Sequence, residues 1–428
     1  MKQKNKFRIA MISEHGDPLA PLGGQQSGGQ NVYVHELARA LSKLGVSVDV
    51  YTRWDNRKSD PVVRFAERAK VIRLKAGPRQ FVSKDKFGPL MPEFVEKFLE
   101  YTRTSKTKYD LIHSHYYFSG WAGLQLKNIL KIPLVGTYHS LGLLKKKAMG
   151  ERDTSPTERT AIERLVMEKA NKIIATSPSE KLSMISEYKP KNADISVVPC
   201  GVNLLRFKPN DKIKTRKKLG ISLDKKIVVF ASKMERRKGA LTVVAVAREI
   251  KKRWPDLYEN LQIYMFSGDP RKERVGEKQE ENFRRVLIDE IKKSGVKDKI
   301  ILEHGIDQEK LHDYYCAANV VLMPSYYEPF GMVAIEAMAS GTPVVASNVG
   351  GLKWVVEDGI TGFRAEPKAA DKFAKQVARI LLDPVLEKRL GENGIVKMRQ
   401  NFSWNTVAEK ALDIYKELIT QNQTTNKK

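Results

Sequence analysis

Residues 320–347 read VVLMPSYYEPFGMVAIEAMASGTPVVAS. The segment starts with a short apolar run that ends at Pro324, continues as a helical stretch from about Phe330, and closes with a second apolar run over residues 343–347. Gly341 ends the helical stretch, and glycine readily adopts the left-handed conformation of a helix C-cap. The segment therefore predicts a strand–helix–strand unit, the repeating element of a parallel α/β sheet.

The same alternation of short apolar runs and helical segments extends over most of the chain. Between the first two runs, Val34, Leu37, Ala38 and Leu41 have the spacing of an amphipathic helix. The predicted strands are residues 7–13, 46–51, 71–74, 111–115, 133–137, 172–176 and 195–199 in the first half, and 227–231, 262–267, 300–303, 320–324 and 343–347 in the second. The pattern predicts the α/β class, with two Rossmann-like parallel-sheet domains facing each other across a cleft.

The length of the chain agrees with two domains, because single cores stop growing near roughly 250 to 300 residues and this chain has 428. A lysine-rich, irregular stretch after residue 203 marks the expected boundary. We expect one domain over residues 1–205 and a second over residues 206–403. A helix over about residues 404–420 is expected to pack back onto the first domain, and residues 421–428 are expected to form a frayed tail.

The chain is strongly basic, with 76 lysines and arginines against 50 acidic residues and a net charge of +26. Its lysine runs, at residues 145–147 and 208–226, are not interleaved with aromatic residues as a base-stacking surface would be, so we expect no nucleic-acid partner. A solvated basic face, attraction of phosphorylated substrates and peripheral association with anionic membranes all remain open.

The two cysteines, Cys200 and Cys316, are too few for a disulfide framework or a four-cysteine zinc site. No stretch approaches the roughly 20 consecutive apolar residues that span a bilayer. The apolar run at residues 7–12 is interpreted as a first strand, because no small-residue cleavage site follows it. We therefore expect a cytoplasmic protein.

Two carboxylates flank the start of the helix predicted within residues 320–347. Glu328 lies in the turn after the strand, and Glu336 follows about two helical turns later. The first turn of that helix presents free backbone N–H groups and a partial positive charge, which suit a diphosphate. The carboxylates suit sugar hydroxyls, although an isolated pair of this kind is equally well interpreted as two solvated glutamates.

Two loops offer further groups for phosphate. The loop after the first strand of the second half contains Lys233 and Lys238, which can converge on one phosphate pair. In the first half, the glycine-rich loop 22–31 opens a helix, and Gly28 and Gly29 allow close backbone approach to an anion. The loop matches neither the G-x-x-x-x-G-K-S/T nor the G-x-G-x-x-G motif. A solvated basic loop and a flexible glycine turn remain the alternatives.

His113 and His139 fall at the carboxyl ends of two predicted strands, where α/β proteins bind their ligands. His139 can bond a sugar hydroxyl or orient reacting groups, whereas a structural role with bonds to the backbone is the alternative for either histidine. Neither has cysteines or carboxylates nearby at metal-ligand spacing, and the chain contains no D-x-D triplet. We therefore expect no metal site.

Together these residues resemble a known family. The segment from Glu328 to Glu336, with its continuations that start at Gly341, Gly350 and Asp358, resembles the E-x7-E region of glycosyltransferase family 4. The resemblance implies the GT-B fold, with two Rossmann-like domains around a cleft, and transfer with retention of anomeric configuration. It also implies a nucleoside diphosphate sugar as co-substrate, with no metal or other cofactor required, which agrees with the missing D-x-D triplet.

The resemblance also assigns roles to individual residues. Glu328 would contact the donor hexose and Glu336 the ribose hydroxyls, and Lys233 stands where the family usually has an arginine, so a point charge replaces a bidentate fork. The residues expected to bind the donor are Gly28, Gly29, Lys233, Lys238, Glu328, Phe330, Gly331, Met332 and Glu336. The residues expected to be catalytic are His139, Lys233, Lys238 and Glu328.

The first half is most similar to the branch that contains sucrose-phosphate synthases, sucrose synthases and inositol-phosphate-dependent glycosyltransferases. The similarity lies in the segments that start at Gly28, His113, Tyr138 and Asp153. In the inositol-phosphate users a lysine, a tyrosine and an arginine bind the acceptor phosphate. The expected acceptor-binding residues here are Lys84, Tyr116, Ser140 and Arg159.

The expected function is transfer of a hexosyl group, glucose from UDP-glucose, to a small hydroxyl acceptor that carries phosphate, such as fructose 6-phosphate or an inositol phosphate. Two alternatives remain open at this point. One is a lipid- or polysaccharide-directed glycosyltransferase at the inner membrane face, and the other is a non-catalytic module that binds anions. The sequence does not determine the oligomeric state.

Overall fold

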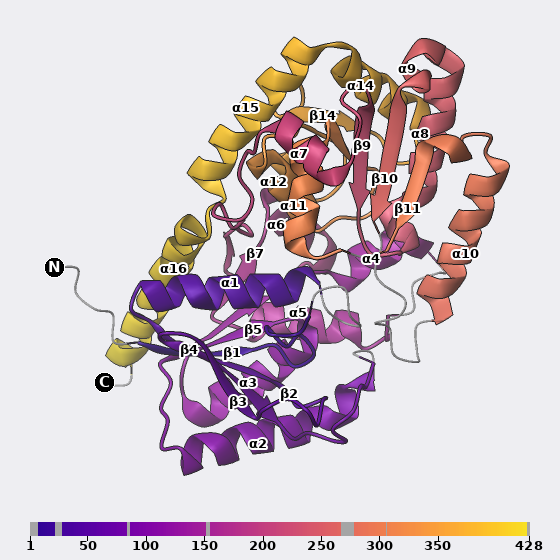
Figure 1. Cartoon of the computed structure of the whole chain (residues 1–428). Helices are drawn as coiled ribbons and strands as arrows, with labels where there is room; N and C mark the ends of the chain where they lie inside the picture. Colours follow the sequence, from indigo (N-terminus) through magenta and orange to yellow (C-terminus); the bar gives the residue numbers. More distant parts are fainter. Residues whose placement is uncertain are drawn as a thin grey trace. The chain divides into compact units, whose positions relative to one another are not determined.

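The computed structural model describes residues 7–21, 28–83, 86–150, 155–266, 278–304 and 306–425. It divides the chain into two compact units (Figure 1). Unit 1 contains the described residues up to Gly201 and those from Trp404 onward, and unit 2 runs from Val202 to Ser403. The chain therefore passes from unit 1 to unit 2 between Gly201 and Val202, a few residues before the boundary that we expected after residue 205. The two crossing segments lie side by side, because the Val202 N–H donates to the Phe402 carbonyl at 2.7 Å.

Within its described residues, unit 1 is built on an eight-stranded sheet with the order β3-β4-β2-β1-β5-β6-β7-β8. All neighbouring strands are parallel except β3 and β4. The strands are β1 (Arg8–Ile12), β2 (Ser47–Arg53), β3 (Val62–Ala66), β4 (Ala69–Leu74), β5 (Leu111–His115), β6 (Leu134–Thr137), β7 (Lys172–Ala175) and β8 (Ile195–Val197).

The helices of unit 1 connect these strands and cover the sheet. They are α1 (Gly29–Lys43), α2 (Met91–Thr104), α3 (Tyr117–Leu130), α4 (Gly142–Met149), α5 (Arg159–Lys169), α6 (Pro178–Ser183) and α16 (Trp404–Thr425). The 3₁₀ turn η2 (Gly88–Leu90) precedes α2, and the π-helical turn η4 (Met184–Tyr188) follows α6. The periodicity of α1 has the expected result, because Val34, Leu37, Ala38 and Leu41 are all buried.

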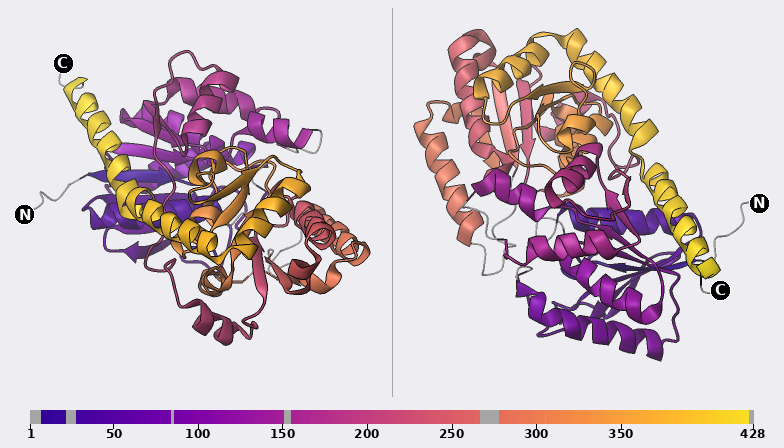
Figure 2. Two further views of the ribbon diagram at one scale, coloured as in Figure 1. Left: turned by 90° about the horizontal axis from the view of Figure 1, so that it is seen from above. Right: turned by 180° about the vertical axis from the view of Figure 1, so that it is seen from behind.

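Helix α16 corrects one expectation. It packs on α1 and continues to Thr425 (Figure 2), so residues 421–425, expected to be frayed, are helical. The Asn422 side chain donates to the Lys131 carbonyl at 3.1 Å, and the Thr424 hydroxyl bonds the carbonyl one turn earlier. These side-chain bonds stabilise a polar end that the sequence pattern alone did not mark as helical.

Within its described residues, unit 2 has a six-stranded, all-parallel sheet with the order β11-β10-β9-β12-β13-β14. Its strands are β9 (Lys226–Ala231), β10 (Leu261–Phe266), β11 (Ile300–Glu303), β12 (Val320–Met323), β13 (Val344–Ser347) and β14 (Gly362–Ala365). Its helices are α7 (Lys212–Leu219), η5 (Arg236–Lys238), α8 (Ala240–Arg253), α9 (Pro255–Glu259), α10 (Lys278–Lys293), η7 (Lys297–Lys299), α11 (Gln308–Ala317), α12 (Met332–Ala339), α13 (Leu352–Val355), α14 (Ala370–Leu382) and α15 (Pro384–Asn401).

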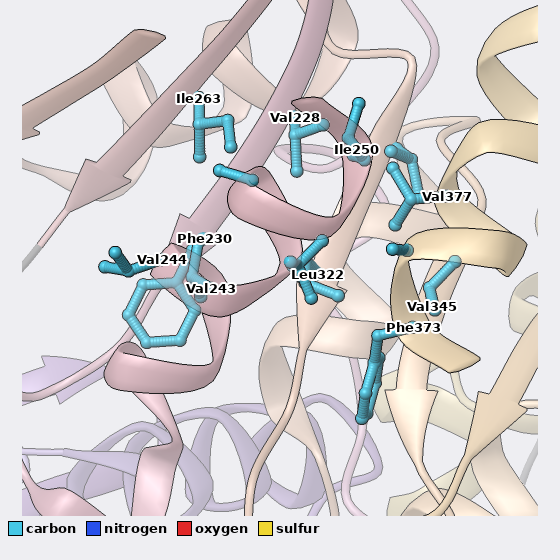
Figure 3. Close-up of a cluster of buried hydrophobic side chains, with 14 of the residues drawn as sticks. Val228, Phe230, Val243, Val244, Ile250, Ile263, Leu322, Val345, Phe373 and Val377 are labelled. Atoms are coloured by element: carbon cyan, nitrogen blue, oxygen red, sulfur yellow. The ribbon is translucent and has the colours of Figure 1, made fainter. Parts of the chain in front are cut away.

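The core of unit 2 lies between its sheet and the helices α8 and α14 (Figure 3). Val228 and Phe230 project from β9, Val243 from α8, and Phe373 and Val377 from α14, and all five are buried. β-Branched and aromatic side chains fit a pleated surface that is covered by helices, which explains why these apolar runs form central strands. The two parallel α/β sheets confirm the predicted fold class.

Each sheet has one point at which the chain reverses its direction of growth. In unit 1 the strands β2 and β4 lie on one side of β1 and the strands β5 to β8 on the other. In unit 2 the strands β10 and β11 lie on one side of β9 and the strands β12 to β14 on the other. In open α/β sheets, ligands bind beyond the carboxyl ends of the strands at such switch points. The loops after β1 and β5, and those after β9 and β12, are therefore expected to carry the ligand-binding groups.

Candidate active site

The switch point of unit 2 holds a buried ion pair. Lys238, at the end of the loop after β9, donates from Nζ to Glu328 Oε2 at 2.6 Å, and Glu328 lies in the loop after β12. Only 18% of the lysine side chain and 9% of the glutamate side chain are exposed. Burial lowers the pKa of Lys238, and the Glu328 carboxylate opposes that effect. The structure thus brings together two residues that the sequence placed in separate loops.

Backbone contacts hold these two loops against each other. The Tyr326 N–H donates to the Arg237 carbonyl at 2.7 Å. Gly239 has a φ of +75°, and a Cβ atom there would overlap the Pro324 carbonyl oxygen, so only glycine permits this approach. Arg237 also connects the two loops, because its Nη1 donates to the Tyr327 carbonyl at 3.4 Å. The position of Lys238 relative to Glu328 is therefore fixed by the main chain as well as by the ion pair.

The N-terminus of α12 lies directly after Glu328. Gly331 is the N-cap, with a φ of +112°, and it offers no side-chain oxygen to the first turn. Met332 and Val333 are partly exposed, and the N–H groups of a first helical turn have no acceptor within their own helix. The arrangement presents backbone donors and the positive end of a helix dipole beside the Lys238 ammonium, which suits a diphosphate. The expected helix started at about Phe330, which is instead buried just before the cap.

Glu336 is the second carboxylate of this region and is buried on α12. Burial raises its pKa to about 8, while the positive charge of Arg206 and the Tyr315 hydroxyl act in the opposite direction. A hydroxyl-bearing ligand is well matched to a carboxyl that lacks full solvation, because it restores the hydrogen bonds that water would provide. Lys233 is different: it is partly exposed, and no described residue accepts a hydrogen bond from its ammonium.

In unit 1, three histidines lie at the carboxyl ends of β5 and β6. His113 is a structural residue, because its Nδ1 bonds the Tyr415 hydroxyl at 2.6 Å and its Nε2 bonds Thr137 Oγ1 at 2.9 Å. His139 has a φ of +60°, and its Nε2 lies 3.1 Å from Nδ1 of His115. Burial lowers the pKa of His139 to about 3, so the ring is neutral.

Three of the four expected acceptor residues, Tyr116, Ser140 and Arg159, lie together in unit 1. The guanidinium of Arg159 lies 5.0 Å from the Tyr116 ring centre and donates to the Ser140 carbonyl at 2.6 Å. Arg159 is only 2% exposed, and its Nε donates to Glu163 at 2.8 Å. The carboxylate of Glu163 in turn accepts the Gly142 N–H. Arg159 therefore organises the loop after β6 in addition to any contact with a ligand.

Two further expectations concern the loops before α1 and α2. Gly28 is the N-cap of α1 in an extended conformation, and Gly29 is the first residue of the helix. The Gly28 N–H is occupied, because it donates to Asn31 Oδ1 at 2.9 Å. Lys84 lies outside the described residues.

The site predicted from the sequence did not include Glu14 and His15, which lie shortly after β1 at the switch point of unit 1. Glu14 is buried and accepts the Ser119 hydroxyl, and its Oε1 lies 2.8 Å from His15 Nδ1. The His15 ring packs edge-on against Tyr116 at 4.6 Å. Their signal in the sequence was a Glu-His pair directly after the first strand. Glu163 was also missed, although its spacing of four residues from Arg159 is that of a helical ion pair.

Among the described residues, no group of three or more histidine, cysteine, aspartate or glutamate side chains is arranged to hold a metal ion. Within the same part of the chain, no helix has both the length and the apolar character needed to span a bilayer.

Two parallel-sheet units, with cationic, carboxylate and imidazole groups at their switch points, fit a nucleotide-sugar-dependent glycosyltransferase of the GT-B fold, and the comparisons with known proteins show that class. Residues 27–206 match the family model described as Glycosyltransferase Family 4, and residues 211–397 match Glycosyl transferases group 1. The chain belongs to glycosyltransferase family 4.

Its relatives lie in the branch that the sequence indicated. A D-inositol 3-phosphate glycosyltransferase of Corynebacterium glutamicum (strain R) is 34% identical over 417 residues, which cover 96% of this chain and 97% of the relative. A sucrose-phosphate synthase from Thermosynechococcus elongatus has a TM-score of 0.89 and 35% identity, over 97% of this chain and 100% of that one. Anabaena HepE in complex with UDP-glucose shares the fold, with a TM-score of 0.71 and 19% identity over 96% of this chain and 100% of that one.

Proposed function

We propose that this protein transfers a glucosyl group from UDP-glucose, with retention of anomeric configuration, to the hydroxyl of a small phosphorylated acceptor such as fructose 6-phosphate or an inositol phosphate. The buried Lys238–Glu328 pair beside the N-terminus of α12 is the observation that carries the proposal. Two relatives that are more than 30% identical are named for transfer to an inositol phosphate and for sucrose phosphate synthesis, and both names involve a phosphorylated polyol or sugar.

In this proposal the protein stabilises the charge that develops on the departing diphosphate. Lys238, Lys233 and the amides at the start of α12 face the leaving group, and Glu328 binds hydroxyls of the hexose. The acceptor attacks from the face that the diphosphate leaves, and a phosphate oxygen of the leaving group takes the acceptor proton. This route needs no side-chain nucleophile, so positioning by Glu336 on the ribose and His139 on the hexose contributes in place of covalent catalysis.

The acceptor phosphate is proposed to lie near Tyr116, Ser140 and Arg159, which the structure gathers at the loops after β5 and β6. Lys84 is proposed to complete this site. The reaction requires no metal or cofactor in this proposal, so activity should persist in excess EDTA. A cytoplasmic setting suits the donor. Peripheral attachment to an anionic membrane would be indicated by turnover with the anionic lipid vesicle in the assay described next.

The test is release of nucleoside diphosphate from a panel of nucleotide sugars, each with fructose 6-phosphate, an inositol phosphate or an anionic lipid vesicle as acceptor. We expect UDP-glucose with one of the phosphorylated polyols to be the productive pair, and the NMR coupling of the product to show the retained anomer. Lys238→Ala and Glu328→Ala should each lower turnover by about tenfold or more.

The matched control is Lys397→Ala, which breaks the Lys397–Glu357 ion pair elsewhere in unit 2 and should leave turnover unchanged. Full activity in Lys238→Ala would exclude the proposed donor site. Turnover only with the lipid vesicle would replace the proposed acceptor by a membrane one. Donor binding without any turnover across the panel would indicate the anion-binding module.

A further inference from the structure

The pair formed by His115 and His139 has a geometry that the assignment of His139 alone does not explain. His115 ends β5 and is completely buried, whereas His139 follows β6 and is partly exposed. The two rings are stacked with centroids 5.2 Å apart and planes 29° apart, and His115 Nδ1 lies 3.1 Å from His139 Nε2. Tyr33 packs edge-on against both rings, at 5.7 Å and 4.9 Å.

The environment determines which of the two nitrogens donates. Both rings are neutral, because burial lowers both pKa values far below neutral pH, so each ring carries one proton. His115 Nε2 is buried and has no hydrogen-bond partner among the described residues. If His139 were the donor, His115 would carry its own proton on that nitrogen, as a buried N–H without an acceptor, which is the costlier of the two arrangements. His115 therefore donates from Nδ1, and His139 carries its proton on its own Nδ1.

The backbone at His139 supports a constrained role for this ring. His139 has a φ of +60°, a region that residues with a side chain rarely adopt. Such strain persists only where the surroundings determine the conformation, and it is concentrated at functional sites. The stacked His115 ring and the edge-on Tyr33 ring provide those surroundings.

We propose that His115 is a positioning residue, which holds His139 as the Nδ1–H tautomer so that this N–H donates to a hydroxyl of the donor hexose. This inference rests on the proposed function, in which His139 faces that sugar. His115 does not touch the substrate. It acts by occupying His139 Nε2, which leaves Nδ1 as the single donor on the partly exposed side of the ring.

Three substitutions at position 115 separate this role from simple packing. His115→Asn keeps an N–H donor near the place of Nδ1, His115→Gln moves the amide toward the place of Nε2, and His115→Leu removes the donor. We expect kcat to fall by about 10- to 100-fold in His115→Gln and His115→Leu, and by less than about fivefold in His115→Asn. The KM for the nucleotide should change little, because the ribose and diphosphate contacts remain. His35→Leu, on the partly exposed face of α1, is the control and should keep full kcat.

The second readout does not depend on activity. Long-range proton–nitrogen NMR correlations identify which ring nitrogen of His139 is protonated. We expect Nδ1 in the native protein and in His115→Asn, and Nε2 in His115→Leu. A native His139 that is protonated on Nε2 would overturn the inference, as would equal kcat in the Asn and Gln variants. If no nucleotide sugar is turned over, the proposed function fails, while the tautomer measurement still decides the role of His115.

Discussion

The ion pair between Lys238 and Glu328 should contribute to stability and to catalysis by separable routes. In the free protein each charge satisfies the other, and with a bound donor both charges gain further partners. We therefore consider Lys238→Met, Glu328→Gln and the double variant. The two single variants leave one buried charge without its partner, and the double variant removes both charges while it keeps similar side-chain volumes.

The distance between the two charged groups sets the magnitude of their attraction. At the observed 2.6 Å the Coulomb attraction is about 6 kcal/mol at an effective dielectric constant of 20, and desolvation of the two ions offsets much of it. Removing one partner from a buried pair costs about 3 kcal/mol, at the low end of the usual range, because the lysine keeps some exposure to water. The double variant should lose only about 1 kcal/mol. Turnover should nevertheless fall at least tenfold in all three variants, because none retains both groups.

Stability should be measured where the pair lies, since a chain of two units need not unfold in one step. Hydrogen exchange of peptides from β12 under increasing urea reports the local free energy of opening. Lys397→Met is the matched control: it breaks a pair of 2.7 Å in the same unit, and it should reduce protection of β12 little and turnover not at all. A double variant that is less stable than either single variant would refute the reasoning. So would a double variant with native turnover.

Three further substitutions test other parts of unit 2. Gly239→Ala should cost more than about 2 kcal/mol in urea unfolding, because its Cβ meets the Pro324 carbonyl, whereas Gly220→Ala, at a φ of +68° in open space, should cost about 1 kcal/mol; equal costs would contradict the tight contact. Since the pKa of Glu336 is raised to about 8, the unfolded chain loses this proton first, and stability should fall between about pH 5 and pH 8 by at most about 1.4 kcal/mol per pH unit. Glu336→Gln should flatten that part of the pH profile, and an unchanged slope would show that other groups cause it. Arg216→Met should lower stability by about 3 kcal/mol in thermal unfolding, because it removes a buried guanidinium that donates to three backbone carbonyls, and a native Tm would show that water replaces those bonds.

The positions of the strands along the chain could be predicted because parallel sheets require continuous apolar runs that leave a clear pattern. All twelve predicted runs correspond to strands of the structure. Two strands were missed for physical reasons. β3 is a half-exposed edge strand, so its sequence lacks the fully buried pattern. β14 is the edge strand of the other sheet, and Gly362 and Arg364 interrupt what would be an apolar run.

The candidate site could be predicted only where it is local in sequence. The spacing from Glu328 to Glu336 placed one carboxylate before α12 and the other on it, because a helix has a fixed rise. The Lys238–Glu328 contact spans 90 residues and depends on β9 and β12 being neighbours, which no local pattern encodes. Arg159 was selected from the sequence, but only part of its role was predicted. The family motif selected it as an acceptor ligand, but its bond to the Ser140 carbonyl, and the bond that Glu163 accepts from the Gly142 N–H, depend on the packing of α5 against the loop after β6.

The topology explains why the polar residues gather where they do. Crossovers between parallel strands are right-handed, so the helices that follow β9 and β12 must leave toward opposite faces of the sheet. The loops before those helices consequently diverge at the carboxyl edge and leave their polar groups without a covering helix. Lys238 comes from one of these loops and Glu328 from the other, and in unit 1 His15 and Tyr116 follow β1 and β5 in the same way. The ligand-binding groups therefore come from four loops at the carboxyl edges, whereas the strands that precede these loops carry the apolar core.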